Sequence, residues 1–223
     1  MRTPNEATTK TLEKPFVILC EGTDDKNFLD CYFSYLRDNS DPRFKDNIQV
    51  NRFDGAEKLS DSLATMKNTE GYENVKRILV IRDADTNINA AIRKVESAFR
   101  HNALPVPTVC NQWAGDTPPN TAYTLMPACD VSSKTGALED LCWDILIRDD
   151  LISFKHDVQS FIDEIKSKYN SIGSHEHKSR IHTYFSVNKE FVSMKIGEAA
   201  RAGAFNWEHE KLEPLKKLIE TGL

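Results

Sequence analysis

The chain has 223 residues, of which 39% are hydrophobic and 28% charged, a composition that is typical of a soluble globular protein and excludes a disordered one. No stretch approaches the roughly 20 apolar residues of a membrane span, and the polar start is unlike a signal peptide, so we expect a cytoplasmic protein with no membrane partner. Because 34 acidic residues outnumber 29 basic ones, giving a formal net charge of −5, nucleic-acid binding would need metal ions, a basic patch or a second protein.

The first half of the chain alternates apolar runs with helical patterns. Residues 16–20 and 78–81 are uninterrupted apolar runs, which are typical of strands covered on both faces. Apolar spacing also predicts a short strand within 47–53 and helices after Gly22, after Gly55 and over 88–100, with residues 39–46 as a loop. Gly22 suits a tight turn, and Thr23 or Asp24 is the expected N-cap of the first helix. The strand–helix alternation predicts a parallel, doubly wound sheet.

From Pro105 onward the pattern changes. Residues 106–110 and 121–127 are expected to form two further strands joined by a turn at 116–120. The remaining sequence is helical in tendency, over 136–147, 156–169, 178–188, 191–203 and 213–221. The expected organisation is a flexible N-terminus (1–14), an α/β domain (15–148) and a helical C-terminal region (149–223) packed on the same domain. The five scattered cysteines lack zinc-site spacing, so we expect reduced, mostly buried thiols.

Two aspartates follow the central apolar run directly. Asp83 and Asp85 are separated by one residue, and a strand continued through them would direct both carboxylates to the same side, about 7 Å apart at their Cα atoms. That spacing suits a divalent cation. An ordinary solvated turn is the alternative, because aspartate and asparagine are common in loops.

Glu21 supplies a possible partner for these aspartates. It follows the apolar run 16–20, and the carboxyl ends of parallel strands meet at one edge of a sheet, where open α/β folds bind ligands. Carboxylates gathered there raise one another's pKa unless a cation neutralises them, and hard oxygen ligands favour Mg²⁺ or Mn²⁺.

These segments resemble a known family. FVILCEGTDDKNFL is similar to the glutamate motif of the Toprim domain, and ILVIRDADTN resembles its D-x-D motif, in the same order. The two motifs span Phe16 to about Asn87, and the EG-x-x-D form is closest to the OLD-type nucleases and their small stand-alone relatives. The resemblance implies a Toprim-like Rossmannoid sheet, with Glu21 as a metal ligand or general acid/base and with Asp83 and Asp85 as metal ligands.

Three further residues are assigned by the same resemblance. Asp25 corresponds to the second acid of OLD-type enzymes, or is a first-turn residue favoured by the helix dipole. Glu139 resembles an acid that helps to bind a second metal, or is an ordinary helix acid. Lys178 resembles the conserved lysine of OLD-type sites, within a short surrounding match, or is an ordinary exposed lysine. His175, His177 and His182 could form a metal cluster, but they fit no standard zinc spacing, and a polar loop running into a helix is the favoured explanation.

The resemblance implies Mg²⁺- or Mn²⁺-dependent hydrolysis of phosphodiester bonds in nucleic acid, DNA rather than RNA. The chain has no tyrosine in a transesterification context, which argues against strand passage. A non-catalytic Toprim module that binds metal or nucleic acid, or that docks on a separate ATPase, is the alternative hypothesis, and the acidic balance favours it. A receiver-like phosphoacceptor is a third, which the lack of a clear late strand bearing a lysine disfavours.

Overall fold

The computed structural model describes residues 11–127, 135–146, 152–169 and 176–223. Its strands are β1 (Phe16–Cys20), β2 (Ile48–Arg52), β3 (Arg77–Asp83) and β4 (Asn120–Met126). Its α-helices are α1 (Thr23–Asn39), α2 (Arg43–Asp46), α3 (Leu59–Lys67), α4 (Ile88–His101), α5 (Leu138–Asp144), α6 (Ile152–Tyr169), α7 (Glu176–Val187), α8 (Ile196–Arg201) and α9 (Glu213–Glu220). Short 3₁₀ turns are η1 (Ala56–Lys58), η2 (Tyr72–Asn74) and η4 (Glu210–Leu212).

The four strands form one parallel sheet in the order β2-β1-β3-β4. Ile18 of β1 lies opposite Val50 on one side and Leu79 on the other, and the register continues without a bulge. All five residues of β1 are buried, as the apolar run 16–20 predicts for a strand covered on both faces. The parallel α/β sheet expected from the sequence is therefore confirmed.

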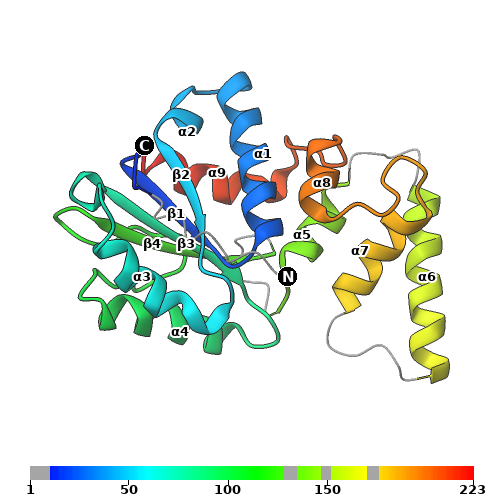
Figure 1. Cartoon of the computed structure of the whole chain (residues 1–223). Coiled ribbons are helices and arrows are strands. Elements are labelled where there is room, and N and C mark those ends of the chain that lie inside the picture. The colour runs from blue at the N-terminus through cyan, green and yellow to red at the C-terminus, as the bar shows by residue number, and fades with distance from the viewer. Residues whose placement is uncertain (1–10, 128–134, 147–151, 170–175) are drawn as a thin grey trace, which may run out of the picture.

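Helices cover both faces of this sheet (Figure 1). Alternate residues of β1 and β3 face opposite ways, so Ile18 and Leu79 join one apolar cluster while Val17 and Val80 join the other. The first cluster is completed by α1, α5, α8 and α9, and the second by α3 and α4. The result is a three-layer arrangement with the sheet in the middle.

The strand order reverses between β1 and β3. The connection through α1 carries the chain from β1 to β2 on one side, and the connections through α3 and α4 carry it back past β1 to β3 and then β4. In open α/β sheets, ligands bind outside the carboxyl ends of the strands at such a switch point. Glu21 and Asp83 stand at the two strand ends that border it.

The C-terminal helices share the core of the sheet. Ile181, Phe205 and Ile219 belong to the same buried cluster as β1, and the Asn206 amide donates to the Ile145 carbonyl at 2.7 Å. The helices α6 and α7 pack side by side and extend away from the sheet (Figure 1). The expected boundary between residues 148 and 149 falls outside the described residues. At the other terminus, Leu12 is buried and its amide donates to Glu70 O at 2.8 Å, although it lies in the segment expected to be flexible.

The expected hairpin of residues 106–110 and 121–127 is wrong. Only the second segment forms a strand, β4, and it pairs with β3 in parallel. Pro105 and Pro107 remove two backbone donors from the first segment. This segment instead runs irregularly beside β4, and further on a single antiparallel bridge joins Ala114 to Thr121.

Three local expectations also need correction. The segment 39–46 contains the short helix α2, because Asp41 accepts from the Arg43 amide at 2.8 Å and Phe44 is fully buried. The helix expected over 191–203 is confined to α8, since Ser193 has a φ of 64° and breaks the helical path before it. The helix expected over 136–147 begins at Leu138 and ends at Asp144.

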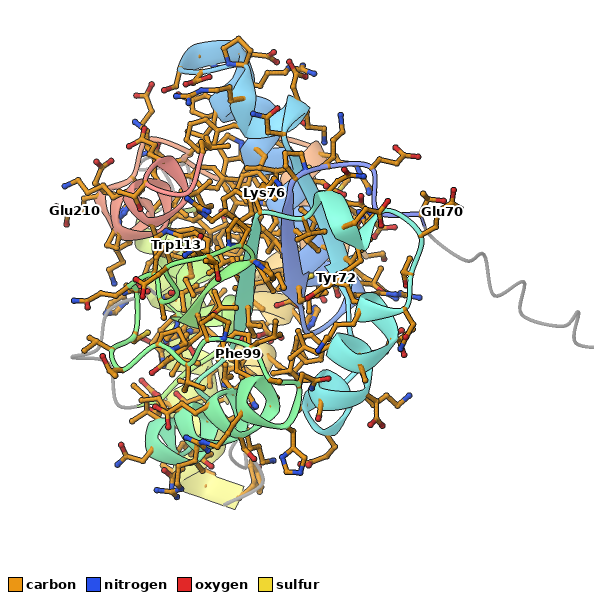
Figure 2. The ribbon with its side chains drawn as sticks, turned by 90° about the vertical axis from the view of Figure 1, so that its left-hand side faces the viewer. Glu70, Tyr72, Lys76, Phe99, Trp113 and Glu210 are labelled. Carbon is orange, nitrogen blue, oxygen red and sulfur yellow. The ribbon has the colours of Figure 1, made fainter. Side chains whose placement is uncertain are left out.

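Figure 2 shows the molecule from the left-hand side of Figure 1. Tyr72 and Phe99, labelled there, belong to the cluster that α3 and α4 cover. Trp113, also labelled, donates its indole N–H to Leu218 O at 3.0 Å, and Arg77 lies over its ring at 5.7 Å. This tryptophan joins the strands to α9.

The four cysteines within the described residues are free thiols, and three are buried (Cys20, Cys110 and Cys142); Cys129 lies outside those residues. In the described part of the chain, none of the helices is long and apolar enough to cross a bilayer.

Candidate metal centre

Glu21 follows β1 directly and is only partly exposed. One of its carboxylate oxygens, Oε2, is buried and has no hydrogen-bond partner. Burial raises the pKa of Glu21, against the opposing effect of the positive charge of Arg82. The end of β1 is fixed by the Phe53 amide, which donates to Cys20 O at 3.0 Å. A buried carboxylate oxygen without a hydrogen-bond partner is available to bind a cation.

Asp25 lies in the first turn of α1. Its Oδ2 accepts from the Gly22 amide at 3.1 Å, which makes Gly22 the N-cap in place of the expected Thr23 or Asp24. Gly22 has an extended backbone, and a Cβ there would lie 3.2 Å from this carboxylate, so the glycine serves close approach and not the sharp turn expected from the sequence. Burial raises the pKa of Asp25 to about 6, and the charges of Glu21 and Glu139 add to the effect. Its Oδ1 is buried and unbonded.

Asp83 ends β3. Its Oδ1 accepts from the Leu138 amide at 2.9 Å, which connects it to the start of α5. Burial holds the pKa of Asp83 well above its usual range, and the carboxylates of Asp25, Glu139 and Glu21 contribute in that order. These three neighbours are the acids that the sequence and the resemblance bring to this edge of the sheet.

Asp85 does not accompany Asp83. The strand ends at Asp83, and Asp85 has a left-handed backbone with a φ of 53°. Its side chain is 58% exposed and forms an ion pair with Arg82, with Nη2 and Oδ2 3.2 Å apart. The expectation that both carboxylates leave the same side of an extended strand is therefore wrong, because the backbone turns between them.

Glu139 and Lys178 come from two C-terminal helices. Glu139 is in the first turn of α5, and Lys178 in the first turn of α7. Lys178 Nζ lies 3.8 Å from Glu139 Oε1; the lysine side chain is 51% exposed and the glutamate side chain 13%. The pair brings residues of α5 and α7 to the acids at the strand ends.

These residues line one cavity of about 460 Å³, which we call the carboxylate cavity. It contains five of the six residues proposed from the sequence, all except Asp85. Its lining is Glu21, Gly22, Thr23, Asp24, Asp25, Asp54, Gly55, Asp83, Leu138, Glu139, Lys178 and Ile196. Segments more than 150 residues apart in the chain thus meet at the switch point of the sheet.

A second cavity of about 620 Å³ contains Asp85, and we call it the paired hollow. Its lining is Asp85, Thr86, Thr135, Gly136, Asp140, Glu176, His177 and Arg180. Each of its three acids has a basic partner. Arg82 pairs with Asp85, Arg180 with Asp140 at 2.9 Å, and Lys166 with Glu176 at 2.6 Å.

The donor set of the carboxylate cavity suits Mg²⁺ or Mn²⁺, which prefer hard oxygen ligands. Among the described residues, no three acidic, histidine or cysteine side chains already stand in a metal-ligating arrangement. Asp25 and Asp83 are instead turned toward backbone amides. Buried oxygens of Glu21 and Asp25 have no hydrogen-bond partner, so the chemistry of this donor set fits a hard cation.

One feature of the site was not anticipated from the sequence. Arg82 is 1% exposed, although it is a charged residue in a buried strand, and its Nη1 is buried without a partner. The signal in the sequence that could have revealed this buried charge is a single arginine between the apolar run 78–81 and the two aspartates. His177 lines the paired hollow and His182 is exposed, while His175 lies outside the described residues.

The molecule is thus a parallel α/β protein with an acidic cavity at the carboxyl edge of its sheet. Residues 15–221 match the family model described as "Protein of unknown function (DUF3226)", and the chain belongs to that family. Searches of curated proteins and of solved structures gave no match.

Proposed function

We propose that this protein is a cytoplasmic nuclease of the Toprim type that binds Mg²⁺ or Mn²⁺ in the carboxylate cavity and hydrolyses phosphodiester bonds of nucleic acid, DNA rather than RNA. The observation that carries the proposal is the meeting of four carboxylates and one lysine in a single cavity. Glu21, Asp83 and Glu139 come from three different elements of the fold. The resemblance of the two strand-end segments to Toprim motifs supports the same chemistry.

The four carboxylates have a common task in this proposal. Glu21, Asp25, Asp83 and Glu139 hold the cation, whose charge offsets the burial and the mutual repulsion that together raise the pKa of Asp83. When bound, the cation neutralises charge on the phosphate and polarises the attacking water. The unbonded Oε2 of Glu21 would act as the general base that accepts a proton from the attacking water.

Lys178 has a separate task. It is the basic residue that lines the carboxylate cavity within the described residues, and half of its side chain is exposed. A flexible ammonium at the mouth of the cavity can donate to a phosphate oxygen of the substrate and stabilise the charge that develops during cleavage.

The charge of the cavity sets the order of binding. Six of its lining residues are acidic, and the whole chain carries a formal charge of −5, so a phosphate cannot approach it favourably before a cation is present. Cation binding in the absence of nucleic acid is therefore expected.

The first test is Mn²⁺ binding by calorimetry on the wild type and on Asp83→Ala, followed by a cleavage screen on single- and double-stranded DNA and RNA. Loss of binding in the variant, with Mn²⁺-dependent cleavage by the wild type only, is the expected result. Equal cleavage by Asp83→Ala and Glu21→Gln would reject the site. Folding of each variant is checked by circular dichroism.

A non-catalytic module is the second candidate function, and the net charge of −5 favours it. In that case the protein binds the cation without cutting and docks on a separate ATPase. Cation binding by the wild type, combined with no cleavage of any of the four substrates and co-purification with an ATPase, is the result that would select this candidate.

A further inference from the structure

The two aspartates of the D-x-D segment face different cavities. Asp83 lines the carboxylate cavity, whereas Asp85 lines the paired hollow. Asp85 could join the proposed cation site only by leaving the paired hollow. Two independent sets of contacts hold Asp85 where it is.

Arg82 forms the first set. This arginine is 1% exposed, and it donates from Nε to Asp83 O at 3.2 Å and from Nη2 to Asp85 Oδ2 at 3.2 Å. Its Nη1 is buried and has no hydrogen-bond partner. Asp85 is the carboxylate that forms an ion pair with this guanidinium. Moving Asp85 to a cation would remove the carboxylate that forms an ion pair with this buried guanidinium, which is unfavourable.

The backbone forms the second set. The Asp85 amide donates to Gly136 O at 2.8 Å, and the Gly136 amide donates back to Asp85 O at 2.8 Å. Gly136 has a φ of 138°, and a Cβ there would lie 2.8 Å from Pro127 Cδ, so only glycine allows this close pairing. The two hydrogen bonds of this isolated bridge thus fix the turn that directs Asp85 away from Asp83.

We propose that Asp85 is a positioning residue that holds Arg82 in place, and that the cation is held by Glu21, Asp25, Asp83 and Glu139 without it. Arg82 in turn supplies a fixed positive charge behind the carboxylate cavity, beside Glu21. This inference rests on the proposed function, because it assigns the ligands of the cation which that function requires.

The direct test counts the water molecules on a bound cation. Tb³⁺ is a hard, oxygen-seeking probe, and its luminescence lifetimes in H₂O and D₂O report the number of coordinated waters. Replacing a direct ligand by a poorer one admits about one additional water, since such cations fill vacant positions with water. We expect Asp83→Asn to gain that water or lose Tb³⁺ binding, and Asp85→Asn to keep the wild-type number.

A double-mutant cycle on Mn²⁺ affinity gives a second readout. Asp85→Asn alone should weaken Mn²⁺ binding by about 3- to 10-fold, because Arg82 without its Asp85 partner repels the cation more strongly. In the Arg82→Met background, the same change should have less than about a twofold effect. Arg82→Gln replaces Arg82→Met if the latter fails to fold, and the water count stands without either.

The outcomes separate the two proposals. An additional water in Asp85→Asn, or an undiminished effect of Asp85→Asn in the Arg82→Met background, would overturn the inference and make Asp85 a ligand. Failure of the wild type to bind either Tb³⁺ or Mn²⁺ would remove the proposed cation site itself, and the inference with it. Wild-type hydration in Asp85→Asn together with a changed Asp83→Asn supports both.

Discussion

The carboxylate cavity and the paired hollow are lined by the same kinds of residue, but the acids in the two cavities have different partners. In the paired hollow, Asp85, Asp140 and Glu176 each have an arginine or lysine partner. In the carboxylate cavity, Asp25 and Asp83 accept from backbone amides, and burial and mutual repulsion raise their pKa values. A paired acid is satisfied by the fold, whereas an unpaired buried acid is available to a ligand.

Neighbouring residues on the same elements are divided between the two cavities. Glu139 and Asp140, adjacent on α5, line different cavities, and so do Lys178 and Arg180 on α7. Adjacent residues on a helix point about 100° apart, so one element contributes to both sites. The division makes matched substitutions on a single helix possible.

The largest expected effect comes from removing an unpaired acid. Asp83→Asn keeps an oxygen that can accept from the Leu138 amide but removes the charge, so cleavage should fall about 100-fold or more, together with loss of Mn²⁺ binding. Cleavage rates with Mg²⁺ and Mn²⁺, and calorimetry with Mn²⁺, are the measurements. Asp144→Asn, on α5 outside both cavities, is the control; an equal loss in that variant would contradict the assignment.

Lys178→Met should have the next largest effect. Loss of a donor to the phosphate is expected to reduce cleavage by about 10- to 100-fold. Mn²⁺ affinity should stay the same or rise slightly, because a positive charge 3.8 Å from Glu139 is removed.

The matched control for this lysine is Lys168→Met. Lys168 on α6 is similarly exposed and is also paired with a glutamate, Glu164, but it lines neither cavity. Parallel cleavage assays and Mn²⁺ titrations on both variants decide the matter: equal cleavage rates for the two would mean that Lys178 has no part in the chemistry.

Arg180→Met tests the other side of the comparison. Arg180 bonds Asp140 at 2.9 Å and lies 4.9 Å from the centre of the Trp143 ring, so it connects α7 to α5. We expect the free energy of unfolding to fall by about 1 to 2 kcal/mol and Tm by about 2 to 8 °C. Mn²⁺ affinity should be unchanged. Urea denaturation and calorimetry check both, with the exposed Arg93→Met as control; a large loss of Mn²⁺ binding would show that the paired hollow is part of the cation site.

Much of the fold could be predicted from the sequence because buried parallel strands have continuous apolar runs. Residues 16–20 and 78–81 predicted β1 and β3, and of the acids that follow them Glu21 and Asp83 line one cavity at the edge of the sheet, whereas Asp85 does not. Residues 106–110 misled because β-prone side chains do not compensate for prolines at 105 and 107.

The site could be predicted only where it depends on strand order. Glu21 and Asp83 meet because their strands are neighbours, and a parallel sheet dictates that. The position of Asp85 was predicted wrongly because local backbone contacts, here the bridge to Gly136, determine where the strand ends. The side-chain pattern does not determine it. The pairing of Asp85 with Arg82 follows from that turn, so sequence spacing could not reveal it.

Asp25 gives the smallest effect, through the pH dependence of stability. The pKa of Asp25 is raised from 3.8 to about 6 in the folded protein, so without metal the folded state binds this proton more tightly than the unfolded state. The contribution of Asp25 to stability is therefore fully present below about pH 4 and is lost as the pH rises through about 6.

Asp25→Asn removes this dependence while keeping an acceptor for the Gly22 amide. At pH 7 in EDTA, the variant should be more stable than the wild type by about 1 to 2 kcal/mol, with the difference shrinking toward pH 4. Urea denaturation at pH 4, 5, 6 and 7 measures it.

Asp41→Asn provides the control of opposite sign. Arg43 lowers the pKa of Asp41, so this carboxylate stabilises the fold above its ordinary pKa, and its removal should cost stability at pH 7. Saturating Mn²⁺ should favour the ionised carboxylates and therefore abolish the advantage of Asp25→Asn at pH 7. An advantage that persists in Mn²⁺ would mean that the strain at Asp25 is not relieved by a cation, and the carboxylate cavity would then lose its distinction from the paired hollow.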